Sequence, residues 1–454
     1  MNTQANANKQ IGIVYGLEDK PPFLQSVLTA LQHLMSMVIS IGTPPLVICR
    51  ALDMPLDITL YMVNIAFFIS GIGTFLQTTR VGPIGSGLLS IQATSFIFPT
   101  AFITFGLAAM KADPSLTKEG VVALMSGATI VGSLVQITLS RMTGLLHRVF
   151  TPLVCGITVT LVGVSLINVA MTDVLGGFGA MGTDDWASLQ NLALGGIVVA
   201  TILVFNCFKN TSLRMAAMVV GFAVGIALAF MLGMLHDAPD HVPLVSIPIP
   251  FKYGLDFTFG GFTSIALLYV ISTVEATGDI SATSMLSGEP TSGPIFISRL
   301  SGGILCDGFA SMLGGVFNSF PLAIFAQNNG VIQLTGNASR HVGKYVAAFL
   351  FILGLFPIVG VVFNIIPDAV LGGVLLLLFG IIAATGMRII FTDPITRRSI
   401  LVLGISLGVG IGAAFQPEYI SHLPFWLADL LRSPVAAGGL TAIATNLLLP
   451  KDDD

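Results

Sequence analysis

Charged residues are scarce in this sequence. Asp, Glu, Lys and Arg together make up 9% of its 454 residues, against about 25% in soluble domains. So few charges cannot cover a water-exposed surface, and the hydrophobic fraction of 54% predicts that lipid surrounds much of the chain. The net charge of only −4 argues against a protein that binds nucleic acid by neutralising phosphates. We therefore expect a polytopic membrane protein.

Motifs for enzymes and metal sites are also lacking. The four cysteines occur singly in apolar segments and form no CxxC pair, so neither a disulfide framework nor a zinc site is expected. No P-loop, GxSxG or HExxH motif is present, which leaves no enzyme, no cofactor and no ATP-driven pump to propose. A gradient-driven carrier or channel remains. The polar residues 1–22 do not resemble a signal peptide, and 451–454 form a short charged tail.

Long apolar runs are abundant. A helix needs about 20 apolar residues to cross the hydrocarbon core, and fourteen runs are candidates. They lie near 25–48, 59–79, 88–110, 120–140, 151–172, 191–208, 212–235, 261–283, 297–316, 320–336, 345–365, 368–387, 397–415 and 433–449. The prediction is an all-α protein with about fourteen transmembrane segments.

Basic residues between these runs predict the orientation. With the N-terminus inside, fourteen Lys and Arg fall on the cytoplasmic side and five on the outer side, in agreement with the positive-inside rule. The loop 173–190 carries three Asp and no basic residue, so it is expected to face out. Both termini are therefore predicted to be cytoplasmic.

Two of the runs are poor helices, and they occupy matching places. Gly82-Pro83-Ile84-Gly85 comes directly before the third run, and Asn318-Ser319-Phe320-Pro321 spans the start of the tenth. Each is third in a set of seven, and an odd number of spans turns the second set upside down, which predicts an inverted repeat typical of secondary transporters. Interrupted backbone at membrane depth is tolerated where it is buried or lines a cavity. The alternative is that these residues only permit close helix packing.

Ionisable side chains inside the runs are functional candidates, because inserting each one costs about 2.5–3.5 kcal/mol. Glu275 and Asp279 are spaced i,i+4 and share one helix face. Two such carboxylates cannot both ionise cheaply, which suits one anchor and one proton carrier. Asp307 can carry protons or bond the backbone of a neighbouring helix, and His33 can relay protons or act as a structural hydrogen bonder.

The tenth run also contains the amide-rich segment Gln327-Asn328-Asn329. Amides donate and accept hydrogen bonds together, which matches a heterocycle that presents both N–H and C=O groups. The segment Gln327-Asn328-Asn329-Gly330-Val331-Ile332-Gln333-Leu334-Thr335-Gly336 resembles the signature of the nucleobase–ascorbate transporters, Gln/Glu-Asn-x-Gly-x-x-x-x-Thr-Gly. The contexts of Glu275, His33 and Asp307 are similar to that family as well, and the likeness runs from about residue 18 to 450.

The resemblance implies a fold and a division of the chain. It implies fourteen spans in two inverted seven-span repeats, with short strands in the broken spans 3 and 10. The implied domains are a core at 23–140 (spans 1–4) and 251–365 (spans 8–11), and a gate at 141–250 (spans 5–7) and 366–450 (spans 12–14). Tails at 1–22 and 451–454 complete the chain.

The resemblance also implies roles for ten residues. Those implied to contact the substrate are Glu275, Gln327, Phe96, Phe325, Ala326 and Ser95. Those implied to serve proton coupling or helix contacts are Asp279, Asp307, His33 and Asn328. No residue is assigned to catalysis or to a metal.

The function implied is proton-coupled uptake of an oxidised purine, xanthine or urate, by an elevator-like movement of the core against the gate. Gln at 327 resembles the oxidised-purine branch, whereas Ser95 departs from an Asn expected in some xanthine carriers. The alternatives are another purine, such as guanine or hypoxanthine, and an anion carrier of the same architecture. The expected partners are the purine, the lipid bilayer and a second copy bound through the gate, with no nucleic acid. The expected location is a bacterial inner membrane.

Overall fold

The computed structural model describes residues 13–142, 151–236, 243–391, 394–416, 431 and 433–450. These residues contain fifteen α-helices, one short 3-10 helix (Phe178–Ala180) and two strands of three residues each. The chain is therefore mostly helical, as the sequence predicts. Of the predicted tails, 1–12 and 451–454 lie outside the described residues.

The helices and strands follow one another in two series. The first comprises α2 (Phe23–Ala51), α3 (Leu56–Thr79), β1 (Gln92–Thr94), α4 (Pro99–Ala112), α5 (Lys118–Leu139), α7 (Pro152–Val174), α8 (Leu189–Cys207) and α9 (Thr211–Met231). The second comprises α10 (Phe259–Leu286), α11 (Gly293–Val316), β2 (Leu322–Ile324), α12 (Gln327–Thr335), α13 (Arg340–Leu355), α14 (Ile358–Ile365), α15 (Asp368–Ile390), α16 (Arg397–Phe415) and α18 (Pro434–Leu448).

Each of the fourteen predicted runs coincides with a helix, a bent helix pair, or a strand and the short helix after it. Eight helices in the described part of the chain are long and apolar enough to cross a membrane, or nine if α13 and α14, bent by 76°, form one span. Several apolar runs are thus membrane-spanning candidates by length and composition. The count of fourteen crossings and the inverted repeat stay predictions.

The helix starts have local causes in the sequence. The hydroxyl of Thr117 accepts the backbone N–H of Gly120 at 3.1 Å, which satisfies one free donor in the first turn of α5. α7 begins at Pro152, after a capping Thr151; proline suits this position because it lacks the N–H that would otherwise be unpaired. Such caps fix where each apolar run becomes helical.

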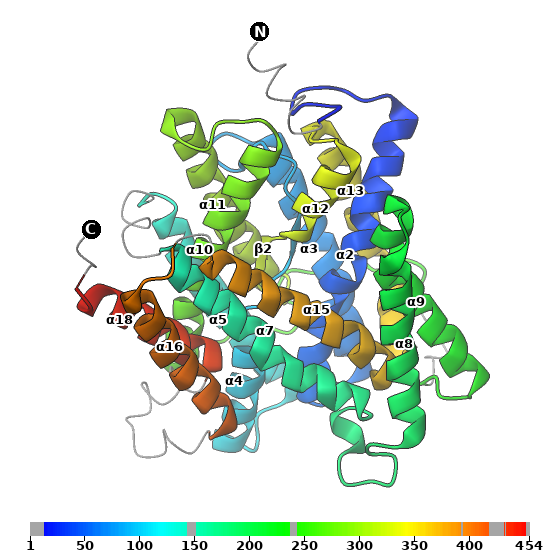
Figure 1. The fold of residues 1–454 in the computed structure, drawn as a ribbon. Coiled ribbons are helices and arrows are strands. Elements are labelled where there is room, and N and C mark those ends of the chain that lie inside the picture. Colours follow the sequence, from blue (N-terminus) through cyan, green and yellow to red (C-terminus); the bar gives the residue numbers. More distant parts are fainter. Residues whose placement is uncertain are drawn as a thin grey trace.

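The helices pack as two groups, and in the view of Figure 1 α7 and α15 cross the centre of the molecule. In one group α3 packs against α2, α11 and α13, and α5 packs against α10 and α11. In the other, α15 packs along α7 and against α8, and α18 packs against α7 and α16. The division of the chain into a core and a gate stays a prediction.

Glycines permit the close approach of α7 and α15. A Cβ on Gly156 of α7 would lie 2.7 Å from the carbonyl oxygen of Gly386 on α15. A Cβ on Gly163 of α7 would lie 2.7 Å from the Cα atom of Ala383. Small residues at these positions let the two backbones touch, which is how helices associate strongly in lipid.

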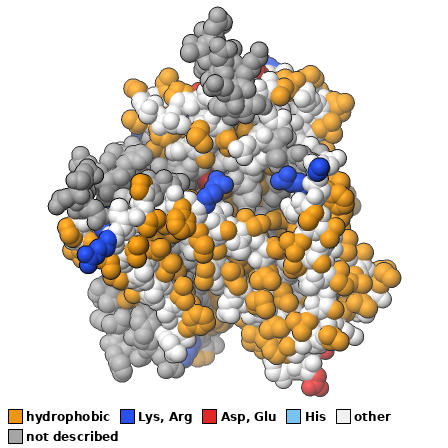
Figure 2. Space-filling view, viewed as in Figure 1, with side chains coloured by type: hydrophobic (Ala, Val, Ile, Leu, Met, Phe, Trp, Pro, Cys, Tyr) orange, Lys and Arg blue, Asp and Glu red, His pale blue; other side chains and the backbone are white. Residues whose placement is uncertain are grey.

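Hydrophobic side chains cover the face formed by α7, α8, α9, α15 and α16, and charged side chains are few there (Figure 2). Only 28% of the most apolar window of α8 and 22% of that of α16 are buried inside the structure. Apolar surface of this extent on a monomer is incompatible with water as the only solvent. The protein is therefore a multi-pass membrane protein, as the composition predicts.

Candidate functional site

The two broken runs meet through their strands. β1 and β2 pair antiparallel, with Gln92 opposite Ile324, and both strands are fully buried. The ladder continues beyond β1, because the backbone N–H of Ser95 donates to the carbonyl of Pro321 at 2.9 Å. The strands implied by the resemblance are thus present, and they pair although β1 lies in the first half of the chain and β2 in the second.

Side chains from neighbouring helices satisfy the outer edges of this small sheet. The N–H of Gln92 donates to the Thr74 hydroxyl of α3 at 3.0 Å. The N–H of Leu322 donates to the Ser311 hydroxyl of α11 at 2.9 Å, and that hydroxyl donates to the Leu322 carbonyl at 3.1 Å. Backbone groups that no helix satisfies are costly at membrane depth, so these contacts allow irregular backbone beside the site.

The structure places five of the six predicted substrate residues around the ends of β1 and β2, and the sixth on the adjacent helix α10. Ala326 is exposed, Gln327 and Glu275 are half-buried, and the other three are buried. Ser95 and Phe96 follow β1; Phe325, Ala326 and Gln327 follow β2; Glu275 lies in the middle of α10. Because α10 packs against both β2 and α12, the six residues belong to one region.

Two phenylalanines from the broken runs face each other. The ring centroids of Phe96 and Phe325 are 5.8 Å apart, with the planes tilted by 40°. A flat base between two rings needs about 7 Å, twice the contact distance of carbon atoms. The rings must therefore separate to sandwich a base, or the base lies against their edges. Phe379 of α15 meets Phe96 edge-on at 5.5 Å, so the second group of helices also borders this place.

Three carboxyl groups of α10 and α11 lie close to one another. Glu275 and Asp279 share a face of α10, and Asp307 of α11 is buried. Glu275 and Asp307 both act electrostatically on Asp279, so the three groups lie within range of one another. No Lys or Arg in the described part of the chain forms an ion pair with any of them. Any of these groups that ionises therefore has no paired cation among the described residues.

A side chain from the first broken run contacts Asp307. The Gln92 amide donates to one carboxylate oxygen of Asp307, which connects α11 to β1. The second oxygen of Asp307 has no hydrogen-bond partner among the described residues, and neither has one oxygen of Asp279. The sequence did not mark Gln92 as a site residue, because nothing local distinguishes it from other buried glutamines.

The three amides of the signature have different surroundings. Asn328 is buried, and its amide donates to the carbonyl of Leu89 in the first broken run. Asn329 accepts a hydrogen bond of 2.6 Å from the hydroxyl of Thr283 on α10. Of the three, only the Gln327 side chain makes no hydrogen bond within the described residues, so it alone keeps both its donor and its acceptor for a ligand. Asn328 and Asn329 hold α12 against its neighbours, which fits the helix-contact role expected of Asn328.

His33 is buried on α2, a helix that packs against α12. Neither of its ring nitrogens has a hydrogen-bond partner among the described residues, so it makes no structural side-chain bond there. No hydrogen bond or ion pair joins it to the three carboxylates in the part of the chain that the structure describes. The structure thus places His33 on a helix that contacts the signature helix, with no bond to the three carboxyl groups among the described residues. No group of three potential metal ligands converges within the described residues.

A separate polar contact joins the two groups of helices. The Arg50 guanidinium at the end of α2 pairs with the carboxylate of Asp368, the first residue of α15. Arg50 also donates to the carbonyls of Ile366 at 2.9 Å and Asn364 at 3.3 Å. Both charged side chains are mostly buried, with exposures of 18% and 17%. A Cβ on Gly177, whose φ is +83°, would collide with Asp368, so this glycine lets the loop after α7 approach the pair.

Comparison with known proteins gives close relatives over the whole chain. Residues 24–419 match the model of a family described as the permease family. Xanthine permease XanP of Escherichia coli (strain K12) is 42% identical over 442 residues, which cover 97% of this chain and 95% of the relative. Xanthine permease XanQ of the same organism is also 42% identical, over 96% of this chain and 94% of its own length. A putative purine permease of Clostridium perfringens is 32% identical over 99% of this chain.

Solved structures of other carriers share the fold. The transmembrane domain of a cyanobacterial bicarbonate transporter, BicA, has a TM-score of 0.61 at 15% identity and covers 94% of this chain and 99% of that domain. The murine anion transporter Slc26a9 in its inward-facing state has a TM-score of 0.63 at 12% identity, over 95% of this chain and 69% of that protein. At such low identity the likeness shows the fold alone.

Proposed function

The chain belongs to the nucleobase–ascorbate transporter family of permeases, and from that premise we propose that it carries an oxidised purine, xanthine or urate, across the membrane together with a proton. It is a permease and not an enzyme, because the family and its named relatives are transporters. The observation that supports a purine most directly is Gln327, the one signature amide that bonds nothing else in the described residues. Gln327 is half-buried at the start of α12, which packs against α10, the helix that carries the half-buried Glu275.

In the proposed binding mode a carboxylate and an amide form hydrogen bonds with the base. Glu275 accepts from an N–H group of the purine, and Gln327 both donates and accepts at another edge. Phe96 and Phe325 contact the ring faces or edges, and the exposed Ala326 offers its backbone. Ser95 is a weaker candidate, because its hydroxyl already accepts the N–H of Ile97 at 3.3 Å.

The proposed proton carrier is the carboxylate cluster. Glu275, Asp279 and Asp307 share an apolar environment without a paired cation, so adding a proton is the simplest way to reduce their repulsion. Substrate and proton would then bind in adjacent positions and cross together. One proton moving across about 100 mV supplies about 2.3 kcal/mol, or about a 50-fold accumulation of purine before any pH gradient is added.

The proposed movement is a shift of the first group of helices, the core, against the second, the gate. The two packing groups support this division, because the signature residues all lie in the first group. The gate borders the site through Phe379 and faces lipid with α8 and α16. We also propose a homodimer through these gate helices, a bacterial inner membrane and cytoplasmic termini, on the basis of the exposed apolar faces and the distribution of basic residues.

The rival function is that of an anion carrier, because BicA and Slc26a9 share this fold. A small anion would require positive or neutral donors at the ends of the strands. The half-buried Glu275 and the two aspartates beside it would instead repel an anion. The carboxylate cluster therefore favours a heterocycle, which can be xanthine, urate or another purine such as guanine or hypoxanthine.

The test is uptake of radiolabelled xanthine and of radiolabelled urate into cells that express the chain, with and without a protonophore. Excess guanine, hypoxanthine and uracil serve as competitors, and bicarbonate tests the anion reading. Uptake that the protonophore abolishes and only oxidised purines inhibit would support the proposal. Sodium-dependent uptake that resists the protonophore would overturn proton coupling, and absence of any purine uptake would overturn the substrate.

Two variants assign the carboxylates in the same assay. Glu275→Gln should lose purine binding, and Asp279→Asn should bind purine but lose proton-driven accumulation. The matched control is Glu119→Gln, which removes an exposed carboxylate in the first turn of α5, away from the site. Wild-type accumulation by Glu275→Gln would refute the anchor role, and proton-driven accumulation by Asp279→Asn would refute the carrier role.

A further inference from the structure

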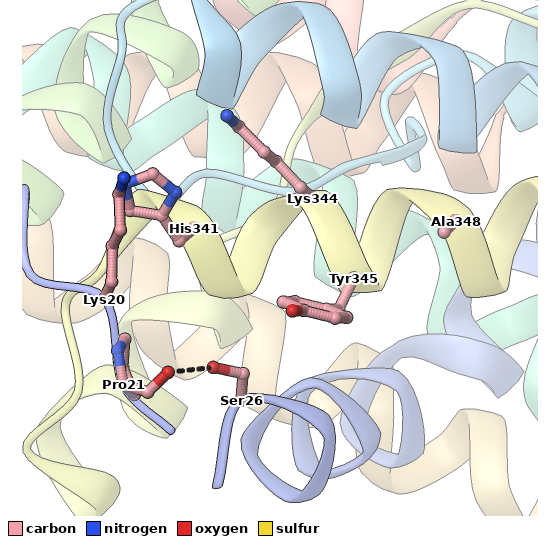
Figure 3. Close-up of a pocket in the computed structure, with 7 residues that line it drawn as sticks. All are labelled: Lys20, Pro21, Ser26, His341, Lys344, Tyr345 and Ala348. Carbon is pink, nitrogen blue, oxygen red and sulfur yellow. Dashed lines mark hydrogen bonds between the residues drawn. The ribbon is translucent and has the colours of Figure 1, made fainter. Parts of the chain in front are cut away.

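A hollow lies between the chain segment that precedes α2, the first turn of α2 and the first turns of α13. Its volume is about 370 Å³. It is lined by Lys20, Pro21, Ser26, His341, Lys344 and Tyr345, with Ala348 at one side (Figure 3). No residue of the purine site lines it.

The charge in this hollow is positive. Lys20, Lys344 and Arg340 all act electrostatically on His341, so these four side chains lie close together. Arg340 is already neutralised by Glu18, at 2.7 Å. The two lysines form no ion pair within the described residues, and no carboxylate lines the hollow. Two positive charges are therefore available to a ligand.

The polar groups near the hollow bond the backbone and do not pair with the two lysines. The carboxylate of Asp19 accepts the backbone N–H of Gly16 at 2.7 Å, and the hydroxyl of Ser26 donates to the carbonyl of Pro21 at 3.1 Å. The backbone N–H of His341 donates to the Ser339 hydroxyl at 3.2 Å, so only the imidazole of His341 is left to bind an anion. The lysine side chains, rather than the helix end, must supply the attraction.

The face of α13 that lines the hollow continues as apolar surface. His341, Tyr345, Ala348 and Ile352 follow one another at spacings of four, three and four, which places them along one side of the helix. Ala348 is exposed, and 48% of Ile352 is exposed. In a membrane protein an exposed apolar face at the end of a basic hollow contacts acyl chains, while the hollow lies at headgroup level.

The neighbouring helix offers a similar face. Four residues of α2 at helical spacing are exposed: Leu24, Leu28, Leu31 and Met35. α2 and α13 pack together, and the rings of Phe23 and Tyr345 meet at 6.0 Å beside the hollow. Acyl chains can therefore lie against both helices below the same basic hollow.

We propose that this hollow binds the phosphate of an anionic phospholipid from the cytoplasmic leaflet, such as phosphatidylglycerol. Lys20 and Lys344 pair with the phosphate, the Tyr345 hydroxyl and His341 can donate to its oxygens, and the acyl chains lie along α13 and α2. A soluble phosphate would use the lysines but leave the apolar faces without a role. The site would place an anionic lipid against the core group of helices.

The test is lipid retention by the purified full chain, measured by native mass spectrometry over a titration of phosphatidylglycerol, with phosphatidylcholine of the same acyl chains in parallel. The variant is Lys20→Gln with Lys344→Gln. The control is Lys111→Gln with Lys209→Gln, two exposed lysines elsewhere that give the same change in net charge. We expect about 30-fold weaker retention of phosphatidylglycerol by the variant, since two lysines near a membrane contribute about 1 kcal/mol each and 1.4 kcal/mol is tenfold.

Further arms separate the sources of phosphate. In one experiment, inorganic phosphate or glycerol 3-phosphate is added to the lipid-bound protein as a competitor. In another, the variant Lys20→Arg with Lys344→Arg, which keeps both positive charges, should retain the lipid. Displacement of the lipid by millimolar inorganic phosphate would identify a soluble-anion site and overturn the proposal. Equal retention of phosphatidylcholine, or equal losses in the control variant, would also overturn it. These outcomes do not depend on the transported substrate.

Discussion

The pairing of Arg50 with Asp368 predicts a shift in the conformational balance when either charge is removed. The pair joins the end of α2 in the core group to the start of α15 in the gate group. If the core moves against the gate, this contact must break in each cycle. The predicted membrane orientation places it on the outer side, so it should hold the outer side closed.

The expected size follows from the contacts that Arg50 makes. Hydrogen bonds to charged groups contribute about 1.5–3 kcal/mol, and the guanidinium and its carboxylate partner are both mostly buried. Arg50→Gln also loses the bond to the carbonyl of Ile366 at 2.9 Å. At 1.4 kcal/mol for each factor of ten, removing the pair should favour the outward-open form by at least about tenfold.

Thiol labelling measures this shift. Ala326 is exposed beside Gln327, so an Ala326→Cys variant reports access to the site. The exposed native Cys207 is replaced by serine in this background. Arg50→Gln should raise the labelling rate from outside whole cells by about tenfold and lower it in inverted vesicles. Asp368→Asn should have a similar effect.

A double variant and a control sharpen the test. If Arg50 and Asp368 act as a pair, the double variant should label about as fast as either single variant. Arg80→Gln is the control, because Arg80 bonds Ser298 at 2.6 Å within the same helix group. Unchanged labelling from both sides in the Arg50 variant would refute the reasoning, as would effects that add fully in the double variant.

Three further predictions concern packing and polar contacts. Gly156→Val should lower the free energy of unfolding of the detergent-purified protein by about 1–3 kcal/mol, because the new Cβ would meet the carbonyl of Gly386. A melting temperature equal to that of the wild type would contradict this close packing. Gln92→Leu should reduce the rate of proton-coupled uptake by tenfold or more, because Asp307 then loses its hydrogen bond; a normal pH profile of uptake would show that this bond is dispensable. Asn318→Ala should also lower thermal stability, by about 2–4 kcal/mol, since the buried amide bonds a serine hydroxyl at 2.8 Å and a glycine carbonyl at 3.0 Å, and φ of +54° disfavours alanine; an unchanged melting temperature would refute this.

The helical runs could be predicted from the sequence because each depends on local composition. Apolar length places all fourteen, and proline or glycine marks the two that are interrupted. The bend of 76° between α13 and α14 was missed, although Pro357 lies at the break and could have indicated it. Boundaries differ by a few residues, as for α10, which extends beyond the predicted 261–283 at both ends.

The candidate site could be predicted only where its chemistry is local. Glu275 and Asp279 are recognisable because four positions separate them on one helix. The bond from Gln92 to Asp307 and the contact of Phe96 with Phe379 join segments that are distant in the sequence, so no local pattern predicts them. The roles assigned to the ten site residues stay predictions until transport is measured.

The contact between Asn328 and Leu89 has a consequence for biosynthesis. The two residues lie 239 positions apart, and their hydrogen bond joins the segment before β1 to the helix after β2. At about 5–20 residues per second, a ribosome needs roughly 10–50 seconds to extend the chain from one to the other. During this interval the backbone of the first broken run has no strand partner within an apolar environment. The nascent first half must therefore shelter these groups, with water or with the insertion machinery, until the second half arrives.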